Sequence, residues 1–382
     1  MTLQLREYRP EDWEQIAAIW SVAFYGNQPL PADSVVAADA AFVAEDNGRI
    51  VGGLRVCTLS ASRGSAVLRC GGIAMVGVSP ACRQRGVGRA MMSWSLERMH
   101  ADGFHLSSLH PFRPSYYRAL GWECAGSRVA IRCPNHRLPR TDGRLEARRV
   151  APEDWQLLEG AYGAFASRYS GMSARDSHRW KRAMRRVALD PLVFAVGEPV
   201  EAYAILELSN KYWADEVVRE LVWSTPAGYR SILSVLSGIA INKSTLTWEE
   251  PADGPFRSAW VDQGVEVTLQ RPLMYRAVNV PAALAALEPE AAGEFSILVD
   301  DPQLPANRGP WRVAFGRDGV DVEPCSDSEI EINIRHFSQA LLGEPSLRAL
   351  VDHGFVVVKS DRAAAAAAAL LPPQPTYCLE MF

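Results

Sequence analysis

The chemistry of this sequence centres on a short stretch in which glycines and arginines separate an expected strand from an expected helix. Residues 73–78 are apolar and predict a buried strand, and Met92, Leu96 and Met99 predict a helix that begins near residue 88. The stretch between them contains Arg83, Arg85, Gly86, Gly88 and Arg89. Glycines let a backbone approach a ligand closely, and the N–H groups at a helix start attract anions. Neighbouring arginines would repel one another without an anion, so we interpret this stretch as a pyrophosphate-binding loop.

The spacing within this loop indicates which anion it serves. No Gly-Lys-Ser/Thr follows, as in a Walker loop, and the full G-x-G-x-x-G of a dinucleotide fold is missing. The pattern R-x-x-G-x-G resembles the acetyl-CoA signature of the GCN5-related N-acetyltransferase (GNAT) superfamily. That resemblance implies that acetyl-CoA binds here and that the backbone amides of Val76 and Val78 hold its acetyl carbonyl. The residues implied in cofactor binding are Val76, Val78, Arg83, Arg85, Gly86, Val87, Gly88 and Arg89.

Two tyrosines downstream could supply a proton to the reaction. Residues 104–109 predict the next strand, and Tyr116 and Tyr117 follow it. When an amine attacks the thioester, coenzyme A leaves as a thiolate that must be protonated, and a tyrosine hydroxyl within hydrogen-bond reach can do this. In this superfamily the general acid is often a tyrosine directly before the pattern arginine, any residue, a hydrophobic residue, glycine and an aromatic residue. The resemblance therefore implies Tyr117 in this role and leaves Tyr116 as the alternative. Simple packing is the competing interpretation of both rings.

Longer strings resemble one branch of the superfamily, the Eis-type (enhanced intracellular survival) acetyltransferases. Residues 76–86 and 109–121 resemble the cofactor and tyrosine motifs of that branch, and residues 278–284 and 293–296 resemble the opening of its third domain. The resemblance implies an α/β (α+β) protein of tandem GNAT folds, the second degenerate, followed by a sterol-carrier-protein-like α+β domain. It also implies a homo-hexamer.

A short internal repeat supports the duplication. Pro-Glu-Asp-Trp occurs at 10–13 and again at 152–155, each time before an amphipathic helix pattern. We therefore expect a catalytic GNAT domain at 1–135, a degenerate GNAT-like domain at 142–277 and the third domain at 278–382. The degenerate copy lacks the loop residues. At the positions of Arg83, Gly86 and Gly88 it has Tyr229, Ile232 and Ser234.

In the third segment, apolar stretches predict strands at 295–299, 311–315, 329–334 and 355–359. Two prolines at 372–373 then set up an extended tail. We interpret the third domain as a scaffold that delivers this tail to the active site rather than as a lipid carrier.

The Eis-type resemblance implies that the C-terminal carboxylate, here that of Phe382, is the general base. In the family an acid directly precedes the last phenylalanine, whereas here Met381 does so and Glu380 lies one position earlier. Glu380 is therefore a candidate for amine recognition. Trp20 and Phe24 are candidates to wall the substrate pocket, although they fit an ordinary core equally well.

Composition narrows the remaining possibilities. The 382 residues carry a net charge of −4 and a pI near 6.0, which argues against nucleic-acid binding. The charged N-terminal stretch lacks the apolar core of a signal peptide, so no such peptide is expected, and no apolar run is long enough to span a membrane. The seven cysteines have no C-x-x-C spacing and are interpreted as reduced thiols of a cytoplasmic protein. The scattered histidines predict no catalytic metal.

The leading expectation is therefore acetyl transfer from acetyl-CoA to primary amines of bulky cationic small molecules such as aminoglycosides. The aminoglycoside class follows from the resemblance alone. A protein or peptide lysine is an alternative acceptor. A non-catalytic acyl-CoA or lipid-binding scaffold is a third possibility, and such a scaffold would need neither Tyr117 nor a defined chain end.

Overall fold

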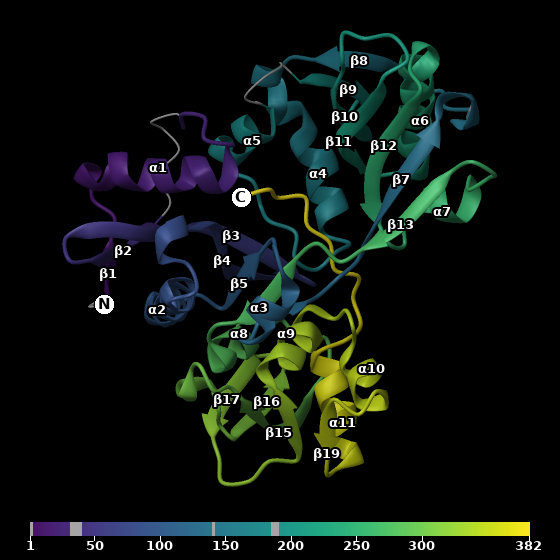
Figure 1. Cartoon of the computed structure of the whole chain (residues 1–382). Coiled ribbons are helices and arrows are strands. Elements are labelled where there is room, and N and C mark those ends of the chain that lie inside the picture. Colours follow the sequence, from purple (N-terminus) through teal and green to yellow (C-terminus); the bar gives the residue numbers. More distant parts are fainter. Residues whose placement is uncertain (1–2, 31–39, 140–141, 185–190) are drawn as a thin grey trace. The chain divides into compact units, whose positions relative to one another are not determined.

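The computed structural model describes residues 3–30, 40–139, 142–184 and 191–382, and the chain folds into two compact units (Figure 1). The first unit contains Met1–Ala125, Pro272–Gln374 and Glu380–Phe382. The second unit contains Gly126–Arg271 and Pro375–Leu379. Each unit thus includes part of the C-terminal tail.

The first unit is built on a seven-stranded sheet in the order β1-β2-β3-β4-β5-β14-β6. Its strands are β1 (Leu3–Glu7), β2 (Ala40–Asp46), β3 (Arg49–Arg63), β4 (Ala66–Val78), β5 (Leu106–Leu109), β6 (Glu123–Cys124) and β14 (Met274–Ala277). Strands β1 to β4 are antiparallel, whereas β4 and β5 are parallel. A parallel pair needs a crossover, and the helix expected near residue 88 provides it.

Helices cover both faces of this sheet. They are α1 (Trp13–Phe24), α2 (Val87–Ala101) and the short α3 (Pro114–Arg118). Successive residues of a strand point to opposite faces. In β2, Phe42 packs in the core that contains α2, and Val43 packs in the core that contains α1. The two helices therefore lie on opposite faces, as Figure 1 shows.

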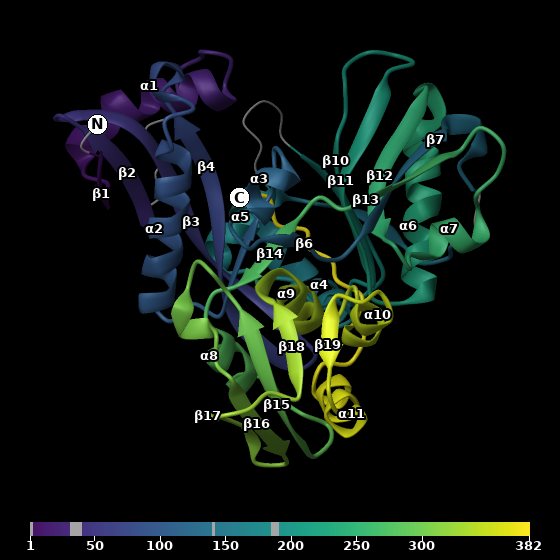
Figure 2. The same ribbon diagram turned by 60° about the horizontal axis from the view of Figure 1, so that its bottom comes forward.

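The C-terminal domain in the same unit has a five-stranded sheet in the order β17-β16-β15-β18-β19. Its strands are β15 (Gly293–Asp300), β16 (Trp311–Gly316), β17 (Gly319–Pro324), β18 (Ile330–Asn333) and β19 (Val356–Val358). Its helices are α8 (Val280–Ala285), α9 (Ile334–Leu342), α10 (Leu347–Asp352) and α11 (Asp361–Leu370). Helix α9 packs on β14 and β18 (Figure 2). The four strands expected here are present, and β17 is an additional one.

The second unit repeats the plan of the first. Its sheet has the order β13-β7-β12-β11-β10-β9-β8. The strands are β7 (Arg128–Pro134), β8 (Ala147–Val150), β9 (Leu192–Val196), β10 (Ala202–Glu207), β11 (Asp215–Trp223), β12 (Thr245–Pro251) and β13 (Glu266–Gln270). The helices are α4 (Glu159–Ala166), α5 (Ser177–Met184), α6 (Pro226–Ile239) and α7 (Pro255–Ala259). Again one parallel pair, β11 with β12, is joined through a helix, α6.

Two strands pair outside the sheets to which the predicted domain ranges would assign them. Strand β7 lies within the range predicted for the first domain but pairs with β12 and β13 of the second unit. Strand β14 lies within the range predicted for the second domain but pairs with β5 and β6 of the first. Sequence periodicity identifies a strand but not its partner, so this exchange had no signal in the pattern.

A buried ion pair links the GNAT sheet to the C-terminal domain within the first unit. The side chains of Arg276 on β14 and Asp301 after β15 are both fully buried. Two hydrogen bonds of 2.7 and 3.1 Å join them, and Arg276 Nε also donates to the Leu120 carbonyl at 3.0 Å. Asn307 Nδ2 donates to Asp301 at 2.9 Å. Both charges are therefore compensated without water.

We predict that Asp301→Ala lowers the free energy of unfolding by about 3–5 kcal/mol, because it leaves Arg276 charged and buried without a partner. Urea denaturation followed by circular dichroism measures this change. The matched control is Glu294→Ala, which removes one of the two exposed partners of Arg312 and should change stability far less. Equal losses in the two variants would contradict a special role for the buried pair.

Candidate active site

The candidate site begins where the parallel strands β4 and β5 stop pairing. Their last pair is Ile73 with Leu109, yet β4 continues to Val78. Met75 has a positive φ of 51°, and the register of β4 against β3 shifts nearby. Beyond Ile73, no strand in the described part of the chain pairs with the β5 side of β4. Backbone groups there can bind a ligand instead.

The loop after β4 leaves the first turn of α2 open. Gly86 precedes this helix with φ 82°, a left-handed conformation that favours glycine. No side chain of the described residues caps the helix start. The first N–H groups of a helix lack partners within the helix, so they are available to an anion.

A cavity of about 630 Å³ opens in front of this loop. Seven of the eight predicted cofactor residues line it: Val76, Val78, Arg83, Gly86, Val87, Gly88 and Arg89. Arg85, the eighth, is exposed on the same loop but does not line the cavity. A Cβ added at Gly88 would lie 3.0 Å from Tyr116 Oη, so a side chain at this position would crowd the cavity.

The charge of the loop is uncompensated. Arg83, Arg85 and Arg89 are exposed, and none of them forms an ion pair with another described residue. Arg83 Nε donates only to the carbonyl of Val78 at the end of β4, at 3.3 Å. The donor set of open amides, glycines and free guanidinium groups fits a diphosphate.

The two tyrosines occupy different environments although they are adjacent on α3. Tyr116 is half-buried and lines the cavity, with its hydroxyl beside Gly88. Tyr117 is only 4% exposed, does not line the cavity and packs edge-on against Tyr116 at 5.1 Å between ring centroids. Burial raises the pKa of both hydroxyls, and it raises the pKa of Tyr117 more strongly. Both hydroxyls are therefore protonated near neutral pH.

Phe382 lies at the point where β4 and β5 separate. Its ring packs on Gly72 so closely that a Cβ added there would come within 2.9 Å of it. The His110 ring, directly after β5, is 5.2 Å from the Phe382 ring, and His110 Nε2 lies 3.2 Å from the Glu380 carbonyl oxygen. Glu380 itself is largely buried and Met381 is exposed. The tail therefore contacts β4 on the other side of the break from the cavity, and neither Phe382 nor Gly72 lines that cavity.

His110 and Gly72 are site residues for which the sequence predicted no role. His110 belonged only to a resembling motif, and its position at the end of a predicted strand was the one available signal. Of the two residues predicted to wall the substrate pocket, only Phe24 lines the cavity. Phe24 is half-exposed, whereas Trp20 is fully buried and packs against Gly77 behind β4.

The corresponding region of the second unit has no cofactor loop. Strand β11 ends at Trp223 and α6 already begins at Pro226. The Thr225 side chain accepts a hydrogen bond from Gly228 N at 2.9 Å and so caps the helix that α2 leaves open. The expectation of a degenerate second GNAT domain is confirmed.

The described residues contain no helix that is both long and apolar enough to cross a bilayer. They also contain no group of three or more histidine, cysteine or carboxylate side chains placed to hold a metal ion.

Comparison with known proteins agrees with this architecture. Residues 4–125 and 171–277 match family models described as acetyltransferase (GNAT) domains, and residues 280–379 match a sterol carrier protein domain. An uncharacterized N-acetyltransferase of Streptomyces coelicolor is 27% identical over 313 residues, which cover 75% of this chain and 74% of that protein.

Two solved structures share the fold over the full length of both chains. A GCN5-related N-acetyltransferase from Anabaena variabilis is 18% identical, with a TM-score of 0.89. Eis1 from Mycobacterium abscessus is 20% identical, with a TM-score of 0.79. The two GNAT-domain matches together span more than half of the chain, which therefore belongs to the GNAT acetyltransferases, as an N-acetyltransferase with tandem GNAT domains followed by a sterol carrier protein domain.

Proposed function

We propose that this protein transfers the acetyl group of acetyl-CoA to a primary amine of a bulky cationic small molecule, such as an aminoglycoside. The observation that carries the proposal is a convergence in the first unit. The anion-binding loop and its cavity adjoin β4 at 76–78, and Phe382 contacts β4 at Gly72, on either side of the last pair of β4 with β5. A thioester aimed along β4 would there be close to the tail.

The reaction makes one bond and breaks one. The lone pair of the neutral amine attacks the thioester carbonyl carbon and forms the C–N bond, and the C–S bond then breaks to release coenzyme A as a thiolate. The proton lost by the amine goes to a base, and the thiolate takes a proton from an acid. We assign the stabilisation of the negative oxygen in between to the backbone amides of Val76 and Val78.

We assign the cofactor's diphosphate to the open start of α2. Gly86, Val87 and Gly88 offer backbone N–H groups, and Arg83 and Arg89 add positive charge at the cavity wall. Arg85 adds charge from outside the cavity. This division of labour matches what is typical of diphosphate sites at helix starts.

We assign the base to the carboxylate of Phe382 and the acid to Tyr117. Support for the base comes from the contacts of Phe382 with Gly72 and His110. Support for Tyr117 comes from the motif resemblance and from burial, which keeps its hydroxyl protonated. Tyr116 is the alternative acid because it lines the cavity.

The acceptor class rests on the Eis-type resemblance and on simple electrostatics. A terminal carboxylate at the site attracts a cationic amine. Glu380, one residue before Met381, would add a second negative charge to the tail. The resemblance alone supports a homo-hexamer, and the seven free cysteines support a cytoplasmic location.

We predict that the purified protein releases coenzyme A when supplied with acetyl-CoA and an aminoglycoside panel, as measured with a thiol reagent.

Adding one glycine after Phe382 displaces the carboxylate and should lower kcat by about 100-fold or more, because general-base catalysis is lost. A glycine added at the N-terminus is the control, and intact mass spectrometry verifies the last residue of each chain. Unchanged turnover in the extended chain would remove Phe382 as base. Turnover of lysine peptides but not aminoglycosides would reassign the acceptor.

We predict that Gly86→Val raises the Kd for acetyl-CoA by about ten-fold or more, because a branched side chain cannot keep φ 82° without strain and the loop must move. Isothermal titration calorimetry measures this Kd. Gly103→Val is the matched control, since Gly103 has φ 75°, has open space around it and follows the other end of α2. Loss of binding in both variants would indicate general destabilisation instead.

We predict that Tyr117→Phe lowers kcat by about 100-fold or more, the usual contribution of a general acid. Tyr116→Phe should change kcat much less and mainly affect the KM for acetyl-CoA. Because burial raises the pKa of Tyr117 above its ordinary value, its hydroxyl stays protonated as the pH rises, and wild-type kcat should not fall up to about pH 10. A larger loss of kcat in Tyr116→Phe would assign the acid to Tyr116.

A further inference from the structure

The degenerate GNAT domain keeps a strand separation of its own. The parallel pairing of β11 with β12 ends at Val217 with Thr247, although β11 continues to Trp223 and β12 to Pro251. This is the same break that β4 and β5 show after Ile73. Because the second unit has no cofactor loop, the space between these separated strands does not bind a thioester and is available to another group.

Part of the C-terminal tail occupies this region. Thr376 forms a parallel bridge with Ser170 after α4. Two backbone hydrogen bonds of 2.9 Å flank the bridge, from Ser170 N to the Pro375 carbonyl and from Tyr377 N to the Ser170 carbonyl. The tail is thus held through its backbone at one isolated bridge to Ser170.

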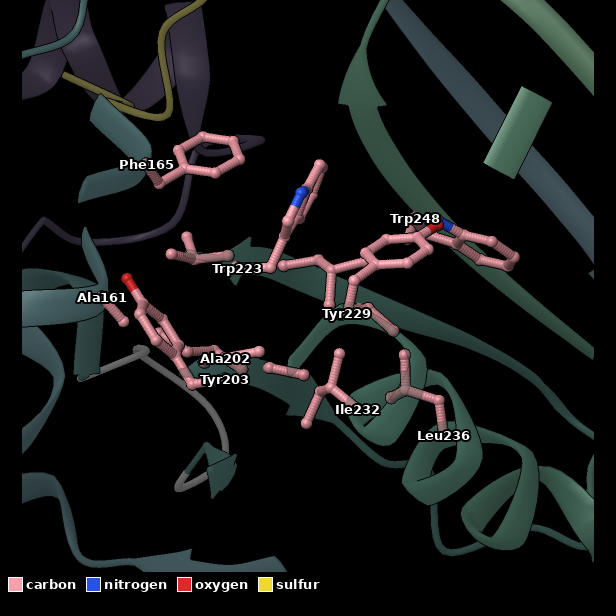
Figure 3. Close-up of a cluster of buried hydrophobic side chains, with 14 of the residues drawn as sticks. Ala161, Phe165, Ala202, Tyr203, Trp223, Tyr229, Ile232, Leu236 and Trp248 are labelled. Atoms are coloured by element: carbon pink, nitrogen blue, oxygen red, sulfur yellow. The ribbon is translucent and has the colours of Figure 1, made fainter. Parts of the chain in front are cut away.

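Tyr377 is the side chain that the tail inserts. It is 4% exposed, and its ring lies 6.1 Å from Phe165 and 5.8 Å from Tyr169 between centroids. Figure 3 shows Phe165 in the core of this unit, with the tail beside it in faded yellow.

Ring contacts place Tyr377 along the strands. Phe165, which contacts the Tyr377 ring, also packs edge-on against Trp223 at 4.9 Å between ring centroids. Trp223 is the last residue of β11 and lies beyond the last pair of β11 with β12. Tyr377 therefore lies beside the separated end of β11.

Gly126 also leaves room for the tail. Gly126 has φ 78°, and a Cβ added there would lie 2.4 Å from the Thr376 carbonyl oxygen. Within the first unit, the base of the tail is held as well. The buried Arg63 donates to Gln374 Oε1 at 2.8 Å and to the Pro372 carbonyl at 2.6 Å.

We propose that the degenerate GNAT domain is a binding site for the chain's own tail, with Tyr377 as a positioning residue that fixes the segment carrying Phe382. One tail thus supplies a ring to the strand separation of each GNAT domain: Tyr377 to the degenerate one and Phe382 to the working one. The consequence for catalysis rests on the proposed function, in which the Phe382 carboxylate is the base. Anchoring raises the effective concentration of that carboxylate at the acetyl group.

The test uses full-length Tyr377→Ala, with Tyr377→Phe as the conservative rescue and Tyr212→Ala as a control that removes an exposed tyrosine of the same unit. The first measurement is the rate at which carboxypeptidase releases Phe382, which reports on tail anchoring without reference to activity. The second is the split between kcat and the KM for acetyl-CoA.

For Tyr377→Ala we expect Phe382 release to be about ten-fold faster and kcat about ten-fold lower, with the KM for acetyl-CoA within about two-fold, because the anchored ring contributes through position and not through the cofactor. Tyr377→Phe should restore both rates, since the ring fills the site. Tyr212→Ala should match the wild type.

Unchanged Phe382 release in a folded Tyr377→Ala protein would overturn the anchor. Faster release with unchanged kcat would support the anchor and overturn the assignment of the Phe382 carboxylate as base, so the two failures are distinguishable. If Tyr377→Ala does not fold, Tyr377→Leu keeps apolar volume while it removes the ring. The same comparison then applies, and unchanged release would again overturn the anchor.

Discussion

The site depends on one constraint, the early end of pairing between two parallel strands. Strand β4 pairs with its antiparallel partner β3 at both ends, with one irregularity at Met75 and Val76, but β5 leaves it after Ile73. A strand edge that is denied a partner leaves hydrogen-bonding groups unmet, which costs free energy unless a ligand or another segment binds them. The left-handed Met75 and the open start of α2 lie on the same side of that break along the chain. We propose that the acetyl donor binds beside this break, where Phe382 also contacts β4 at Gly72, because the sheet is unfinished there.

In the second GNAT domain, side chains stand where the first domain has its anion site. Tyr229, at the position of a loop arginine, donates to the buried Glu250 at 2.5 Å, and Trp248 Nε1 donates to the same carboxylate at 2.9 Å. Burial raises the pKa of Glu250, and these two hydrogen bonds oppose that increase by stabilising the carboxylate in place of solvent. Figure 3 shows Tyr229, Trp223 and Trp248 filling this core. An aromatic and hydrogen-bonded filling replaces the anion site, which explains why the domain can be stable without a ligand.

The sequence predicted local features well because their causes are local. Gly86 was recognisable since its type and spacing report a backbone conformation, and the strand and helix around it follow from periodicity. The exposure of Tyr117 was not predictable, because adjacent residues on a short helix differ in direction by about 100° and a motif does not say which one faces the cavity. Strand β17 was missed since most of its residues are at least partly exposed and carry no buried pattern. The exchange of β7 and β14 depends on pairing across more than a hundred residues, for which the sequence gives no signal.

The tail illustrates how such long-range contacts can carry function. Its composition predicted only an extended segment after two prolines. In the structure, its aromatic residues Tyr377 and Phe382 pack against the two duplicated GNAT domains, one in each. In both copies the parallel pairing ends before the strands do, so the strands separate. The absence of a cofactor loop in the second copy does not change this. A separation that no longer binds a cofactor must still be filled, since an empty one would leave polar edges buried and a void in the core. A nearby extended peptide with an aromatic side chain satisfies both needs at once. On this argument, the loss of cofactor binding in one copy and the tethering of the tail that serves the other copy are consequences of the same fold.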